Sequence, residues 1–283
     1  MSDDILRILG VHGVKNHQVG LEPVQAAERL AGWWRGAVRK GLGLPKEGPD
    51  IPSVEVAYYA HRLHLGTAQG DEDPGLLGPE LQELIVDWAK LCGAPDETAQ
   101  GWLSAPARAA VEWVADKFGL DHKPARILAA VFFREVHTYF TDPGRRAAAT
   151  ADVAEAIQHT APLVVIAHSL GSVVAYEALW AHPHPPIDLL LTVGSPLAMP
   201  DIVYHRLNAH EGARRRPPGV AKWINIADPG DVIAVPAGGI PASFHHVTAD
   251  LTDAIGAFSF HQVTNYLRCG ATAGILATYL QPG

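Results

Sequence analysis

The sequence has few of the features that mark secreted, metal-binding, membrane-spanning or nucleic-acid-binding proteins. Only 2 of its 283 residues are cysteines, too few for a disulfide framework, and Cys92 and Cys269 lack the spacing of a metal site. Apolar runs such as 163–167 are strand-sized and far too short to span a bilayer. The chain has 22 basic and 30 acidic residues, and its net charge of −8 disfavours a nucleic-acid partner. We expect no metal and no integral membrane segment.

The start of the sequence also lacks a targeting signal. It reads Met-Ser-Asp-Asp, which is acidic where a secretory signal is basic, and no apolar run follows. We therefore expect a cytoplasmic protein. The composition predicts no particular oligomeric state.

Apolar residues are abundant, at 48% of the chain, and their arrangement predicts an α/β fold. Residues 5–11 form a short apolar run typical of a buried strand, and residues 22–40 carry apolar side chains at helical spacing. Residues 53–60 have the β-branched and aromatic content of a second strand. Strand, helix and strand in this order predict the opening of a parallel sheet with covered faces.

The same rhythm returns in the second half of the chain. After a helix at 144–159, apolar runs predict further strands, and helical spacing predicts two more helices. The expected strands are 163–167, 187–193, 221–227 and a short last one at 244–247, and the expected helices are 171–180 and 263–280.

Between the two halves the alternation stops. The segment 66–143 begins in a Gly/Asp/Pro-rich loop and then shows three helical patterns, at 79–91, 104–118 and 123–140. We interpret it as a helical cap or lid inserted into one domain that spans residues 1–283.

The strongest chemical signal is an apolar strand followed by Ala167-His168-Ser169-Leu170-Gly171 and a helix. A nucleophilic serine at a strained strand-to-helix turn needs small residues two positions before and after it, so that strand and helix can pass. Ala167 and Gly171 are small. The alternative is an ordinary serine that caps the helix.

AHSLG resembles the GxSxG nucleophile elbow of the α/β-hydrolase family, with Ala167 in place of the first glycine. Leu9-Gly10-Val11-His12-Gly13-Val14 resembles the strand and HG turn that precede the oxyanion hole in lipases and esterases of that family. The resemblance implies that the backbone N–H groups of Val14 and Leu170 bind the oxyanion. For His12 we prefer a structural role in the turn to a catalytic one. The strand and GSP turn at 191–197 are also similar to lipase-like members.

The family orders its triad along the chain as nucleophile, acid and base. By resemblance to the lipase-like branch the acid is Asp231, and Asp228, which precedes a proline, is the alternative. The base is expected after the last strand. His261, which precedes a long apolar segment, is preferred there to His245 and His246.

These residues predict a serine hydrolase that cleaves a carboxylic ester through an acyl-enzyme, without a cofactor. The same machinery serves thioesterases and acyltransferases, and the fold also occurs in interaction modules without turnover. The expected substrate is a small-molecule ester with an apolar portion, because aromatic residues of the insertion could line an apolar pocket or could form the insertion's own core. These residues are Trp88, Trp102, Trp113, Phe132, Phe133 and Tyr139. His61 and His64 have metal-like spacing but no completing ligand, so we expect a surface pair.

Overall fold

A parallel sheet of six strands forms the centre of the molecule, in the order β2-β1-β3-β4-β5-β6. The computed structural model describes residues 6–45, 52–66, 73–95, 105–208, 214–256 and 261–280. The strands are β1 (Arg7–Val11), β2 (Ser53–Ala57), β3 (Val164–His168), β4 (Ile187–Val193), β5 (Val220–Ala227) and β6 (Ala249–Thr252).

The strand order reverses between β1 and β3. Gly10 of β1 pairs with Val56 of β2 on one side and with Ile166 of β3 on the other. From β1 the chain goes first to β2 on one side. It then returns to form β3 on the other side of β1 and continues outward to β6. Ligand sites in open α/β sheets form at the carboxyl ends of the strands at such a reversal, so the ends of β1 and β3 are the place to look for a site.

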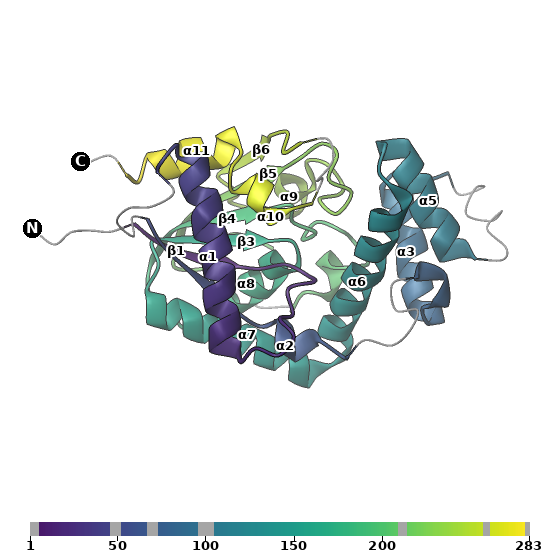
Figure 1. Ribbon diagram of the computed structural model, residues 1–283, viewed down its shortest axis with the longest axis horizontal. Coiled ribbons are helices and arrows are strands. Elements are labelled where there is room, and N and C mark those ends of the chain that lie inside the picture. Colours follow the sequence, from purple (N-terminus) through teal and green to yellow (C-terminus); the bar gives the residue numbers. More distant parts are fainter. Residues whose placement is uncertain are drawn as a thin grey trace, which may run out of the picture.

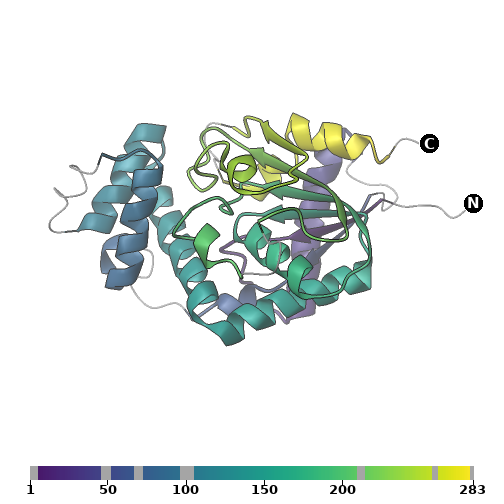
Figure 2. The same ribbon diagram turned by 180° about the vertical axis from the view of Figure 1, so that it is seen from behind.

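Helices cover both faces of the sheet (Figures 1 and 2). Side chains alternate between the faces, so that Ile8 packs with the core around Trp34 while Leu9 packs with the core around Val173. The first face is covered by α1 (Pro23–Gly41), α10 (Val263–Tyr266) and α11 (Gly270–Ala277), and the second by α7 (Pro143–Thr160) and α8 (Leu170–Ala181). The prediction of a parallel α/β fold is confirmed.

The segment between β2 and α7 is helical. After α2 (Ala60–Leu63) and the 3₁₀ turn η1 (Pro74–Leu76) come α3 (Pro79–Leu91), α5 (Pro106–Phe118) and α6 (His122–Thr141). These last three helices pack against one another at one end of the molecule, beyond the carboxyl ends of the strands (Figure 1). The three helices predicted in the insertion are confirmed. Trp102 and Ser104, the predicted start of the second helix, lie outside the described residues.

Two predicted elements are wrong. Residues 244–247 are not the last strand: Phe244 follows α9 (Gly239–Ser243), and its ring packs edge-on against Tyr176 and Trp223 in the core. The last strand is β6, five residues later, and its burial pattern is largely exposed, so an apolar run does not mark it.

The expected C-terminal helix at 263–280 is also wrong, because it is broken into α10 and α11. Cys269 is extended at the junction, and the first turn of α11 is held from outside: the Ala271 N–H donates to the Asp253 carboxylate at 2.7 Å. None of the helices in the described part of the chain combines the length and apolar character needed to cross a bilayer.

Candidate active site

Ser169 lies between the end of β3 and the start of α8 in an unusual backbone conformation. Its φ is 54° and its ψ is −133°, a region that residues with a side chain rarely occupy, and it has no exposed surface. Its N–H donates to the Val193 carbonyl at 3.1 Å, which ties the turn to the end of β4. The sequence predicted such a strained serine at a strand-to-helix turn.

Two glycines let the end of β1 approach this turn. A Cβ at Gly171 would overlap the carbonyl oxygen of His12, and a Cβ at Gly13 would lie 2.6 Å from the Ser169 Cβ. Both positions therefore exclude any side chain. The small residue expected two positions after the serine is explained by the close approach of the loop after β1.

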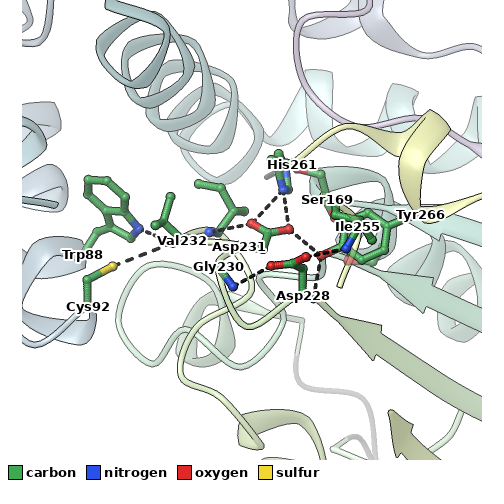
Figure 3. A network of polar contacts seen from close by, with 12 residues as sticks. Trp88, Cys92, Ser169, Asp228, Gly230, Asp231, Val232, Ile255, His261 and Tyr266 are labelled. Carbon is green, nitrogen blue, oxygen red and sulfur yellow. Dashed lines mark hydrogen bonds and ion pairs between the residues drawn. The ribbon is translucent and has the colours of Figure 1, made fainter. Parts of the chain in front are cut away.

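Ser169, His261 and Asp231 form a hydrogen-bonded row (Figure 3). The His261 Nε2 lies 2.8 Å from the Ser169 Oγ, and its Nδ1 lies 2.8 Å and 3.0 Å from the two Asp231 carboxylate oxygens. A carboxylate only accepts, so Nδ1 donates to it and Nε2 is left to accept from the serine hydroxyl. Asp231 and His261 are 2% and 9% exposed, so these interactions are screened little by water.

Asp231 is held by three further groups. It accepts from the Ile233 N–H at 2.9 Å and from the Tyr266 hydroxyl at 2.7 Å. Gly194, with φ 55°, packs so close that a Cβ there would lie 2.8 Å from the carboxylate. Burial raises the pKa of Tyr266, so its hydroxyl keeps the proton that it donates. The carboxylate is thereby fixed in one orientation toward His261.

Asp228, the alternative acid, has a different set of partners. Its carboxylate accepts from the N–H groups of Gly230 and Ile255, both at 2.5 Å, and its own N–H donates to the Tyr266 hydroxyl at 3.0 Å. It therefore shapes the turn after β5, as the proline that follows it suggested. Of the two candidates, Asp231 is the one that contacts His261.

His12 acts within the turn after β1. Its Nε2 accepts from the Tyr59 N–H at 3.2 Å, and its Nδ1 donates to the Gly13 carbonyl at 2.9 Å. Burial lowers the pKa of His12 to about 4, so the ring is neutral at pH 7. These contacts suit the structural role that we preferred for it.

The two residues predicted to bind an oxyanion flank Ser169. Leu170 is the first residue of α8, and the first N–H groups of a helix have no acceptor within it. Val14 follows Gly13, which packs on Ser169. The helix start also contributes a positive dipole end beside the serine. The assignment of these N–H groups to an oxyanion hole remains a prediction.

Two buried residues next to Ser169 were not singled out from the sequence. Ser172 donates to the Ser169 carbonyl at 2.6 Å and lies 2.7 Å from the Ser195 hydroxyl, which braces the first turn of α8. The ring of His168 lies 4.7 Å from that of His261, and neither of its nitrogens has a hydrogen-bond partner among the described residues. Burial lowers the pKa of His168 well below its usual value, so it adds no positive charge to the site.

The other histidines considered from the sequence lie in different surroundings. The backbone of His245 pairs with that of Arg214 and Arg216. Both His245 and His246 are exposed. His64 stacks on His17 at 3.8 Å, and His61 lies 3.6 Å from Asp152. Within the described ranges, no group of three or more potential ligands could hold a metal ion.

Four of the aromatic residues of the segment 66–143 are buried, and Trp113 is half-buried. Trp88, Phe132 and Phe133 pack edge-on in one group, whereas the hydroxyl of the buried Tyr139 donates to Glu177 of α8 at 2.6 Å. Trp88 has a second role, because its Nε1 donates at 2.6 Å to the carbonyl of Val232, the residue after Asp231 (Figure 3). The insertion thus contacts the loop that carries the acid.

No protein-family model, no curated protein and no solved structure matches the chain. What the site can do is therefore argued from its own geometry. A buried carboxylate that orients a neutral imidazole, which in turn accepts from a serine hydroxyl, is an arrangement that activates the serine oxygen as a nucleophile.

Proposed function

We propose that the protein is a serine hydrolase of the α/β-hydrolase fold that cleaves carboxylic esters through an acyl-enzyme. The observation that carries this proposal is the 2.8 Å contact between the Ser169 hydroxyl and the His261 Nε2, with Asp231 on the far side of the ring. The chain order of serine, acid and histidine agrees with that family. The strained φ of Ser169 adds to the support, since strain of this kind gathers at functional sites.

The reaction follows from these contacts. The Ser169 oxygen attacks the ester carbonyl carbon while its proton passes to the His261 Nε2, and Asp231 stabilises the imidazolium. The tetrahedral intermediate collapses when the C–O bond to the alcohol breaks, and the alcohol leaves with the proton from His261. Water then gives a proton to the same nitrogen and attacks the acyl carbon. The bond to the Ser169 oxygen breaks, the carboxylic acid leaves, and the serine takes the proton back from His261.

The negative oxygen of the intermediate would be bound by the N–H groups of Val14 and Leu170. Removing a single donor of this kind typically costs about 3 kcal/mol of transition-state stabilisation. Both donors come from the main chain, so their residue types matter less than the glycine packing that places them.

The helical insertion at 66–143 is proposed to act as a cap on a single domain that spans residues 1–283. In support, its helices α3, α5 and α6 lie beyond the carboxyl ends of the strands, where the proposed nucleophile stands (Figure 1). Its contact with Val232 brings it to the acid loop.

The proposed substrate is a small ester with an apolar portion. A pocket of about 320 Å³ beside Asp231 has apolar residues in its lining, among them Leu91, Phe118 and Ile240, but neither Ser169 nor His261 lines it. The proposed ester class therefore rests on the resemblance of the Ser169 turn and of the loop after β1 to lipases and esterases. The buried insertion aromatics are poorer candidates, because they pack against one another.

A fluorophosphonate tests the proposal directly. Such a reagent phosphorylates an activated serine, so intact-mass spectrometry is expected to show one adduct on the parent protein and none on Ser169→Ala. Ser243→Ala, which changes a serine at the end of α9, is the matched control and should still label.

Either of two results would count against the proposal. A folded parent that stays unlabelled would favour an interaction module without turnover. Labelling of Ser169→Ala to the same extent would place the reactive group elsewhere in the chain.

Tyr266→Phe is expected to slow labelling by about tenfold. The Tyr266 hydroxyl donates to the Asp231 carboxylate and helps to hold it toward His261. Without this donor the carboxylate orients the histidine less well, so the serine is activated less. The labelling rates of the parent and the variant at one pH give the comparison.

Tyr279→Phe is the matched control, because the Tyr279 hydroxyl donates to Asp188 away from the site. Its labelling rate should equal that of the parent. An unchanged labelling rate in Tyr266→Phe would show that the hydroxyl does not help to hold the acid in place.

A further inference from the structure

Two side chains hold the carbonyl of the peptide that would present the Val14 N–H. The carbonyl of this peptide, Gly13 O, accepts from the Asn16 side chain at 3.0 Å and from the His12 Nδ1 at 2.9 Å. In a trans peptide the carbonyl and the N–H point in opposite directions. Fixing the carbonyl therefore fixes the direction of the Val14 N–H.

The next peptide, between Val14 and Lys15, is held at both ends. Its carbonyl, Val14 O, accepts from the same Asn16 side chain at 3.0 Å. Its N–H, that of Lys15, donates at 2.9 Å to the Glu135 carboxylate. Lys15 has φ 62°, a left-handed conformation that costs a residue with a side chain about 1 kcal/mol or more. A contact that holds the Lys15 N–H opposes relaxation of this strained turn.

Glu135 belongs to α6 of the insertion, 120 residues along the chain from Lys15. It is half-buried, and burial raises its pKa to about 7. The partly buried carboxylate loses some of its hydration, and the Lys15 N–H replaces part of it. Burial raises the pKa of Tyr58 and of Tyr59, in the loop after β2, and the nearby Glu135 raises both further.

We propose that Glu135 is a positioning residue for the oxyanion turn. It holds the Lys15 N–H, and through the Val14–Lys15 peptide it keeps the Val14 N–H directed at the site where the oxyanion forms. The inference rests on the proposed hydrolase function and goes beyond it. The insertion then contributes to the rate of the chemical step as well as covering the site.

This role differs from that of a simple tether between two parts of the fold. A tether would affect stability or substrate access, whereas a group that orients an oxyanion donor acts mainly in the transition state. Loss of such a group lowers kcat and leaves KM nearly unchanged. The split between the two parameters therefore separates the two roles.

The experiment measures kcat and KM for p-nitrophenyl butyrate with Glu135→Ala, Glu135→Asp and Glu135→Gln. The first removes the acceptor, and the second retracts the carboxylate by one methylene, so both are expected to lower kcat about tenfold with KM within twofold. Glu135→Gln keeps an acceptor oxygen at the same reach and should retain at least half of kcat. Glu135→Asp also tests the proposal if the alanine variant does not fold.

The control is His137→Ala, two residues further along α6, which removes a contact with Glu80 of α3 and leaves the oxyanion turn alone. Its kcat should match that of the parent. Unchanged kcat in Glu135→Asp, or a loss in Glu135→Gln as large as in Glu135→Asp, would overturn the proposal. A fluorophosphonate adduct on the parent shows in each case that the hydrolase function itself stands, and its absence would remove both.

Discussion

Alanine at Ser169 or at His261 is expected to lower kcat by about 10⁴-fold or more, and the double variant is expected to lose no more than the worse single variant. The reason is that the two side chains act as one unit through their 2.8 Å contact. Without the Ser169 hydroxyl, His261 has no serine proton to accept, so removing the imidazole as well causes no further loss of activity. Steady-state rates of ester hydrolysis for the parent, both single variants and the double variant give this comparison.

Folding of each variant is checked by its thermal unfolding midpoint. Losses that multiply in the double variant would mean that Ser169 and His261 act independently, in conflict with the proposed proton transfer. Near-parent activity in His261→Ala would assign the base to another residue.

Asparagine at Asp231 is expected to reduce kcat by about 10⁴-fold, while asparagine at Asp228 should change kcat by less than about fivefold. Asp231 accepts from the His261 Nδ1 and so selects the form of the ring whose Nε2 can take the serine proton. An amide that presents its N–H₂ group there favours the opposite form. Asp228 contacts the main chain of Gly230 and Ile255 instead.

For Asp228→Asn the effect should appear in stability. The amide can replace one of the two accepted hydrogen bonds, so a loss of about 1–2 kcal/mol in the free energy of unfolding is expected, measured in urea. Equal losses of kcat in the two variants would show that the turn as a whole, rather than the carboxylate on His261, limits the reaction.

The strands that could be predicted are those whose signal is local. β3 and β4 are mostly apolar because helices cover both faces of the sheet there, and the predicted bounds of β4 are the observed ones. β6 is an edge strand with Asp250 and Thr252 exposed, so it has no such run. The sequence predicts a strand at Phe244, because a buried aromatic residue in a loop and one in a strand give the same signal.

The residues of the candidate site also divide into those with a local sequence signal and those without one. Ser169 and Gly171 were found because the constraints on an elbow act over a few residues. Tyr266, Gly194 and Glu135 were missed, because each matters through a contact with a residue that is distant in sequence. No spacing or composition around Glu135 marks it as a partner of Lys15. Such contacts appear only when the chain is folded.

The long segment between β2 and β3 also affects how the chain folds and how its sequence could be changed. β1 must pair with both strands, so roughly one hundred residues form a closed loop between them. Loop-closure entropy grows only with the logarithm of length, so halving that segment would gain only about 0.6 kcal/mol. Chain entropy therefore hardly constrains its size. A shorter or longer segment could be exchanged for it if the contacts at Lys15 and Val232 were supplied in another way.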